Sequence, residues 1–310
     1  MTDKSSVNSW KRYPTVTVVG IGGGGTNAVN RMVDYGIEKI KFVAVNTDVQ
    51  ALDQSVAQTK LQIGARTTDG LGAGANPELG EKSAQENEED IRKLFEGSDM
   101  VILTSGMGGG TGTGASPVFA RIAQDMGILT IAIVTKPFDF EGKRRGEYAK
   151  EGIDKLSKRV DALVTIENQN LLTLERRSAP MHESFALVDD VLRQCVQGIS
   201  ELLYEAGFVN VDFKDLQKVL KNSGRAYFGI GHGKGENRAL DAAQNAVNSK
   251  MIDKSVIESA QSILINTRGS MKFSMEEAMK SVNYITSIAK MNGSEPEVIW
   301  GGGNYRNIKD

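Results

Sequence analysis

Two glycine-rich segments have the residue types and spacing that could hold phosphate groups. The first contains Gly20, Gly22 and Gly25, and the second, GGGTGTG, runs from Gly108 to Gly114. Glycine lets backbone N–H groups approach phosphate oxygens closely and adopts the positive φ angles that such loops use. Each segment follows a short apolar run and precedes a helical pattern. The pair therefore predicts a polyphosphate held between two loops.

Neither glycine segment contains a lysine, so neither fits the Walker pattern G-x-x-x-x-G-K-[ST]. Backbone N–H groups, helix dipoles, the hydroxyls of Thr111 and Thr113, and Mg²⁺ would have to balance the phosphate charge. The alternative interpretation is that these glycines serve only close packing between helices and strands.

The first segment also permits a different chemistry. Gly20-x-Gly22-x-x-Gly25 satisfies the dinucleotide fingerprint, and Asp48 ends the next apolar run, where an acid that binds ribose would stand. This pattern predicts a nicotinamide-dependent oxidoreductase, but it leaves GGGTGTG unexplained. A third hypothesis is a scaffold that binds a nucleotide without hydrolysing it.

The elements that would position these loops follow from hydrophobic patterning. Apolar, β-branched runs alternate with helical patterns and predict a parallel, doubly wound, Rossmann-like α/β sheet; these runs are residues 15–20, 41–48, 100–106 and 128–136. Residues 64–80 are rich in glycine and are predicted to form an ordered loop near the same edge of the sheet.

An apolar stripe at helical spacing predicts one long central helix over residues 183–206. It would join the nucleotide domain to a smaller α+β domain. That domain is predicted from about residue 224 onward, with strands at 226–233, 262–269 and 297–303.

Composition excludes several classes of protein. The chain has 310 residues, a formal net charge of −2 and a pI of about 5.9, which disfavours nucleic acid and anionic lipid as partners. Its single cysteine, Cys195, allows no internal disulfide and fits a reducing compartment. Neither a signal peptide nor a membrane span is apparent, so we expect a cytoplasmic protein without membrane insertion. Residues 1–14 are polar and predict a flexible arm.

GGGTGTG resembles the signature loop of tubulin, and the chain as a whole is similar to the tubulin/FtsZ family of GTPases. The resemblance extends over nearly all of residues 15–310. It rests on six further stretches: VGIGGGGTNAVNRM (19–32), GLGAGANPELG (70–80), TKPFDFEGKRR (135–145), VLRQCVQGIS (191–200), VNVDFKD (209–215) and GENRALDAA (235–243).

This resemblance implies GTP or GDP as the ligand, with Mg²⁺, and it assigns contacts along the nucleotide. Phosphate contacts would come from Gly22, Gly23, Gly24, Asn27, Gly106, Gly108, Gly109, Gly110, Thr111, Gly112, Thr113 and Gly114. The γ-phosphate would be sensed by Ala73, Gly74, Ala75 and Asn76. Glu141 and Arg145 would lie beside the ribose, and Asn168, Phe185 and Asp189 would form the guanine site. There Phe185 would stack on the base and Asp189 would accept its N–H groups, selecting guanine over adenine.

The segment Asn210-Val-Asp212-Phe-Lys-Asp215 has two interpretations. Its spacing favours a helix cap formed by Asp212 or Asp215. The resemblance instead implies that Asn210, Asp212 and Asp215 are catalytic residues acting on the nucleotide of the next subunit in a head-to-tail filament. The carboxylates would orient and polarise water for in-line attack.

The resemblance implies a protein that polymerises into the bacterial division ring, at the division site in the cytoplasm. It divides the chain into a GTP-binding domain (15–181), a central helix (182–207), a catalytic loop with its following helix (208–223), and a C-terminal polymerisation domain (224–310). The family continues into a final strand and an adaptor-binding tail that this sequence lacks, so division adaptors are expected only of a longer parent protein.

Overall fold

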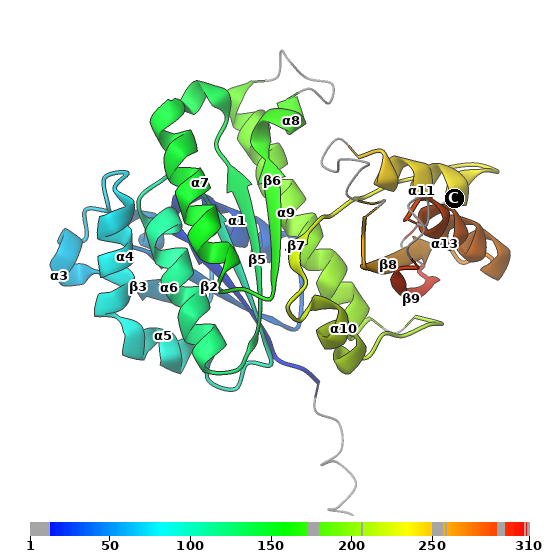
Figure 1. The fold of residues 1–310 in the computed structure, drawn as a ribbon, viewed down its shortest axis with the longest axis horizontal. Coiled ribbons are helices and arrows are strands. Elements are labelled where there is room, and N and C mark those ends of the chain that lie inside the picture. The colour runs from blue at the N-terminus through cyan, green and yellow to red at the C-terminus, as the bar shows by residue number, and fades with distance from the viewer. Residues whose placement is uncertain are drawn as a thin grey trace, which may run out of the picture.

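The computed structural model describes residues 13–172, 180–205, 207–249, 257, 259–289, 295–306 and 308. These residues form a parallel sheet with helices on both faces and a smaller unit beside it (Figure 1). A long helix, α9 (Met181–Tyr204), runs between the two. The predicted fold class is confirmed: a doubly wound domain, a central helix and a smaller α+β unit. The predicted arm, apart from Tyr13 and Pro14, lies outside the described residues.

The large sheet has seven strands in the order β3-β2-β1-β4-β5-β6-β7, and every neighbouring pair is parallel. The strands are β1 (Val16–Ile21), β2 (Ile40–Asn46), β3 (Thr59–Gln62), β4 (Met100–Gly106), β5 (Leu129–Lys136), β6 (Ala162–Glu167) and β7 (Gly224–Ala226). The strand order changes direction between β1 and β4. Parallel sheets bind ligands at such a point, outside the carboxyl ends of the strands. Both predicted phosphate loops follow these two strands.

The helices of this domain connect its strands. They are α1 (Gly22–Tyr35), α2 (Val49–Asp53), α3 (Ala65–Thr68), α4 (Pro77–Glu86), α5 (Glu88–Phe95), α6 (Thr111–Asp125), η1 (Asp139–Glu141), α7 (Lys143–Ser157), α8 (Asn168–Leu172) and, beyond α9, α10 (Phe213–Leu220). The prediction that residues 64–80 form a loop throughout is wrong, because α3 and the start of α4 lie within them. Asn76 caps α4 through its side chain and Pro77 occupies the first turn, which favours helix formation there.

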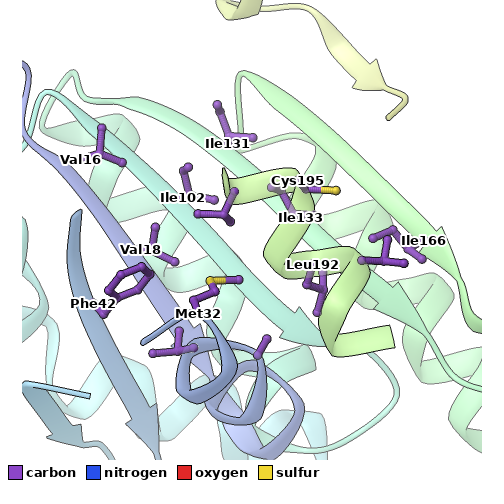
Figure 2. Close-up of a cluster of buried hydrophobic side chains, with 14 of the residues drawn as sticks. Val16, Val18, Met32, Phe42, Ile102, Ile131, Ile133, Ile166, Leu192 and Cys195 are labelled. Atoms are coloured by element: carbon purple, nitrogen blue, oxygen red, sulfur yellow. The ribbon is translucent and has the colours of Figure 1, made fainter. Parts of the chain in front are cut away.

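Side chains from alternate residues of each strand enter two separate cores. Val18 and Ile102 belong to the core beneath α1 and α9, as does Phe42 of β2. In this core they lie with Met32 of α1 and Leu192 of α9 (Figure 2). The neighbouring Val19 and Leu103 enter the second core, on the face that α4, α5, α6 and α7 cover. This alternation follows from the two-residue period of a strand. Because both faces are buried, the strands read as continuous apolar runs.

The smaller unit contains α11 (Arg238–Val247), β8 (Ser262–Gly269), α13 (Met275–Ala289) and β9 (Glu297–Asn304). Strands β8 and β9 pair in parallel, which confirms the predicted strands at 262–269 and 297–303. The predicted strand at 226–233 is wrong, because only Ala226 is in a strand, and that strand, β7, belongs to the large sheet. The glycines further along lie against α11: a Cβ on Gly231 would meet the carbonyl oxygen of Ala242 at 1.8 Å.

An ion-pair group and a backbone bridge are among the contacts that join the smaller unit to the rest of the chain. Arg268 of β8 forms ion pairs with Glu201 and Glu205 on α9 and its C-terminal cap. The backbones of Val209 and Gly302 also exchange two hydrogen bonds, of 3.1 and 3.0 Å. The segment after α9 is therefore attached to β9. Among the described residues, no helix combines the length and apolar character needed to cross a membrane.

Candidate functional site

The first glycine segment forms the start of a helix. Strand β1 ends at Ile21 and α1 begins at once with Gly22, whose φ is 73°. A Cβ on Gly22 would lie 2.8 Å from the backbone nitrogen of Gly112, and one on Gly24 would lie 3.2 Å from that of Gly106. The first segment is thus packed against the second, and only residues without a side chain allow this approach.

The second glycine segment joins β4 to α6, with Gly110 as the N-cap of the helix. Gly108 has a φ of 102°, and its N–H donates to the hydroxyl of Thr113 at 2.8 Å. A Cβ on Gly108 would meet the carbonyl oxygen of Arg145 at 2.8 Å. The loop is therefore held by a hydrogen bond of its own and by close contact with the start of α7.

A third segment, residues 69–76 between α3 and α4, completes this arrangement. A Cβ on Gly110 would lie 2.8 Å from the Cβ of Ala73 and 2.9 Å from the backbone nitrogen of Asn76. Gly74 and Ala75 have φ angles of 55° and 58°, in the left-handed region. The side chain of Asn76 accepts from the N–H of Glu78 at 3.0 Å, so it caps α4.

Three predicted contact residues face open space. A Cβ on Gly23, Gly74 or Gly109 would meet no atom within 4 Å. Asn27, one turn into α1, is exposed as well. The N-termini of α1 and α6 both begin in these segments, and their N–H groups favour an anion. The three segments touch one another, and we call the following residues the glycine cradle: Gly22–Gly24, Ala73–Asn76 and Gly108–Thr111.

Other glycines of the two segments are needed for packing. A Cβ on Gly114 would lie 1.9 Å from the carbonyl oxygen of Pro77, and one on Gly25 would lie 2.3 Å from that of Thr104. The N–H of Gly114 is bonded to the carbonyl oxygen of Gly110. The close-packing interpretation therefore holds for Gly25 and Gly114, whereas Gly23 and Gly109 have no packing reason to be glycine.

The two threonines of the second segment have different surroundings. The Thr113 hydroxyl accepts from Gly108 and holds the loop. The Thr111 hydroxyl lies 2.7 Å from the hydroxyl of Thr47, which follows β2 directly. No sequence motif described above includes Thr47 as a contact residue. Its position after a buried strand, next to the strand that leads into the first glycine segment, was the available signal.

Asp48, which the dinucleotide interpretation places at the ribose, acts as a helix cap. One oxygen of its carboxylate accepts from the N–H groups of Gln50 and Ala51, at 2.9 and 3.2 Å. It is the N-cap of α2. Its local geometry is thus explained without a bound ribose.

The predicted ribose contacts lie next to the glycine cradle. Arg145 and Glu141 form an ion pair of 2.6 Å. The other carboxylate oxygen of Glu141 accepts from the N–H of Phe138 at 2.9 Å. Since the backbone of Arg145 touches Gly108, the structure brings this pair beside the second segment.

The predicted guanine residues come from α8 and α9. Phe185 is 39% exposed, and its ring contacts the buried Phe138 edge to face, with a centroid distance of 5.3 Å. Asn168 is only 5% exposed, and its side-chain oxygen has no hydrogen-bond partner among the described residues. A buried acceptor without a partner is costly, and the N–H group of a ligand would relieve that cost.

Asp189 lies one helical turn beyond Phe185. Burial raises the pKa of its carboxyl from 3.8 to about 6, although the positive charge of Arg31 acts in the opposite direction. Near neutral pH the group is therefore largely ionised and can accept two N–H groups of a base edge. A base that offers such a pair would stabilise the charged form further.

The predicted catalytic residues follow the end of α9 that lies near the start of β1, whereas the glycine cradle lies at the carboxyl ends of the strands. Helix α9 has 24 residues, about 36 Å at 1.5 Å per residue. It begins near Phe138, which follows β5, and its last residue, Tyr204, donates to the carbonyl oxygen of Pro14, just before β1. Figure 1 shows α8 near the start of α9 and α10 near its end. The structure therefore does not bring Asn210, Asp212 and Asp215 to the glycine cradle of the same chain.

The local structure of this segment is well defined. Asn210, Asp212 and Asp215 are all exposed. The side chain of Asn210 accepts from the N–H of Gly207 at 2.8 Å, and Asp212 caps α10. Between them, Val211 is buried. The predicted helix cap is thus confirmed, and the catalytic role stays a prediction.

Comparison with known proteins identifies the family. A model described as "Tubulin/FtsZ family, GTPase domain" matches residues 15–175, and "FtsZ family, C-terminal domain" matches residues 224–310. The chain belongs to the tubulin/FtsZ family. The matched GTPase domain implies that this chain binds GTP or GDP, which favours this ligand over a nicotinamide dinucleotide.

Solved structures of tubulin/FtsZ proteins agree with this assignment. An FtsZ dimer from M. jannaschii is 40% identical, with a TM-score of 0.89, and the match covers 97% of this chain and 86% of that one. CetZ2 from Haloferax volcanii, solved as a GTPγS-bound protofilament, shares the fold at 18% identity and a TM-score of 0.80, covering 94% of this chain and 90% of that one.

Proposed function

We propose that this protein hydrolyses GTP and polymerises head to tail into filaments that form the bacterial division ring. The observation that carries the proposal is the separation of two half-sites. The glycine cradle lies at the carboxyl edge of the sheet, and the exposed Asn210, Asp212 and Asp215 lie beyond the other end of α9. Neither half is a complete hydrolytic site, but a second copy stacked in the same orientation brings them together.

Within the shared site the two sides have different tasks. The glycine cradle binds the phosphates, while Phe185, Asn168 and Asp189 bind guanine. Asp212 and Asp215 of the next subunit orient and polarise the attacking water, assisted by Asn210. Mg²⁺, when bound, would compensate the charge of the phosphates. No group of three acidic, histidine or cysteine side chains that could hold a metal lies within the described residues, so phosphate oxygens and water would supply most of its ligands.

A head-to-tail contact joins two different surfaces and does not close on itself, so it generates an open filament. The names of the two related structures, an FtsZ dimer and a CetZ2 protofilament, are consistent with association of this kind. We infer that assembly and turnover form one cycle, which takes place in the cytoplasm at the division site.

The proposal is tested by recording light scattering and phosphate release together after addition of GTP and Mg²⁺. Over a dilution series, the rate of release per subunit should rise steeply with protein concentration and should appear together with scattering. A rate per subunit that is constant over the series contradicts the shared site. GTP binding with neither scattering nor release favours a scaffold that is regulated by a nucleotide without hydrolysing it.

A further inference from the structure

Thr47 is a buried polar residue that the site as proposed so far does not use. Its side chain is fully buried at the end of β2. Within the described part of the chain its hydroxyl has one hydrogen-bond partner, the hydroxyl of Thr111, at 2.7 Å. Thr111 begins α6 and is itself 8% exposed, at the edge of the glycine cradle. Thr47 thus reaches the nucleotide site only through Thr111.

A hydroxyl group has a single proton to donate and two lone pairs to accept with. In the pair of threonines, either oxygen could be the donor. If Thr111 donates to Thr47, its proton is not available to a ligand. If Thr47 donates to Thr111, the proton of Thr111 is free to point into the cradle. An anionic oxygen there favours the second arrangement, because hydrogen bonds in a chain strengthen one another.

The backbone around Thr47 is held from both sides. Its N–H donates to the side chain of Asn46 at 2.9 Å, and its carbonyl oxygen accepts from the hydroxyl of Thr68 at 3.4 Å. The next residue, Asp48, forms a β-bridge with Leu71, at the start of the loop that leads to Ala73–Asn76. The Thr47 hydroxyl therefore has a fixed position from which to orient that of Thr111.

We propose that Thr47 is a positioning residue for phosphate binding: it donates its hydroxyl proton to Thr111, so that the Thr111 hydroxyl donates to a phosphate oxygen of the nucleotide. This inference rests on the proposed binding of GTP. The inference goes beyond that proposal because it assigns a role to Thr47, which meets the glycine cradle only through Thr111. That role is in recognising the phosphates and not the base.

The test compares Thr47→Val, which keeps the side-chain shape, with Thr47→Ser, which keeps the hydroxyl. Calorimetric titration with GTP, GDP and guanosine reports the affinities. We expect Thr47→Val to bind GTP and GDP about five- to tenfold more weakly, while its affinity for guanosine stays that of the wild type, because guanosine has no phosphate. Thr47→Ser should bind all three ligands as the wild type does.

Two further variants separate positioning from general stability. In Thr111→Val the additional change Thr47→Val should have no further effect, since its action passes through the Thr111 hydroxyl. Thr104→Val is the matched control, because Thr104 is also fully buried in the sheet and its hydroxyl has no partner in the described structure. It should bind all three ligands normally.

Several results would overturn the inference. One is unchanged binding of GTP and GDP by Thr47→Val, and another is an equal loss of guanosine binding, which would indicate a purely structural role. If Thr47→Val does not fold, Thr47→Ser still decides: a loss of GTP and GDP affinity in that variant contradicts the role of the hydroxyl. A wild type that binds no GTP would instead refute the proposed function.

Discussion

The carboxylate of Asp212 accepts a hydrogen bond of 2.8 Å from the backbone N–H of Asp215. This bond caps α10 and places both acidic residues at its N-terminal end, exposed to solvent. One oxygen of Asp212 and the side chain of Asp215 thereby remain available to a neighbouring subunit. Capping and catalysis are compatible roles for this pair.

The variant Asp212→Asn separates the proposed catalytic role of Asp212 from its role as a helix cap. Asparagine is as good an N-cap as aspartate, so Tm should stay that of the wild type. GTP turnover should fall by about 10²-fold or more, because the amide cannot polarise water as a carboxylate does. Phosphate release and thermal unfolding, recorded on the same preparation, give the two results.

Asp212→Ala provides the comparison, since it removes both the cap and the charge. It should lose turnover as Asp212→Asn does and also about 1 kcal/mol of stability. Turnover retained in Asp212→Asn but lost in Asp212→Ala would show that the residue matters only as a cap. If the site is shared as proposed, adding Asp212→Asn subunits to wild type should also lower the turnover of the mixture.

Asp189 predicts a pH dependence of base binding. Burial raises the pKa of this carboxyl to about 6 in the free protein, and only the ionised form accepts two N–H groups. Guanosine affinity should therefore be nearly constant above about pH 7 and decline below pH 6, approaching tenfold per pH unit. Guanosine is used because it has no phosphate group that titrates in this range.

The control for this pH profile is Asp189→Asn, which should bind guanosine weakly and with no pH dependence between 5 and 8.

The raised pKa of Asp189 also affects the stability of the fold. A carboxyl whose pKa is higher in the folded than in the unfolded chain stabilises the fold at low pH, and this contribution is lost as the pH rises through 6. Asp189→Asn should thus raise the Tm of the ligand-free protein at pH 7.5, but not at pH 3.5.

The glycine substitutions separate binding from packing. Gly23→Ala and Gly109→Ala place a methyl group in open space, so we expect wild-type Tm values. Their affinity for GTP should fall about tenfold, since the methyl group keeps the phosphate away from the backbone N–H groups.

Gly114→Ala should have the opposite effect. Its Cβ would lie 1.9 Å from the carbonyl oxygen of Pro77, so α4 and α6 have to move apart. We expect a loss of roughly 1–3 kcal/mol in the free energy of unfolding, measured by urea denaturation. A stable Gly114→Ala, or Gly23→Ala and Gly109→Ala proteins that bind GTP normally, would contradict this division of the glycines.

An ion pair joins α11 to α13 in the smaller unit. Arg238 of α11 lies 2.7 Å from Glu277 of α13, and this bond is the main cause that lowers the pKa of Glu277 from 4.5 to about 2. Stability from this carboxylate is present above pH 4.5 and is lost as the pH falls toward 2. Glu277→Gln should cost about 1 kcal/mol at pH 7, a decrease of roughly 2–4 °C in Tm.

The neighbouring Glu276→Gln is the matched control, because Glu276 is exposed and pairs only with Lys280 of the same helix within the described structure. Its Tm at pH 7 should be that of the wild type. If both variants lose the same stability, or if the loss in Glu277→Gln persists at pH 2, the ion pair with Arg238 is not its source.

Much of the fold was predictable because local signals agreed with the tertiary structure. The apolar runs of β1, β2, β4 and β5 are buried on both faces, and α1 ends at Gly36 in the left-handed conformation, as its sequence indicates. The strand predicted at 226–233 does not form beyond Ala226. Its glycines Gly231 and Gly233 instead pack against the backbone of α11, which is a contact of the tertiary structure. Their close approach to a helix cannot be read from a β-like pattern.

The sequence by itself determined that glycine-rich segments follow two strands of a parallel sheet. Local chemistry suffices for this, since glycine conformation and strand–helix alternation are properties of short segments. Only the tertiary structure decided which glycines face open space, which hydroxyl supports Thr111, and that α9 separates Asp212 from the glycine cradle. These features depend on contacts between residues far apart in the chain, and short-range patterns do not specify such contacts.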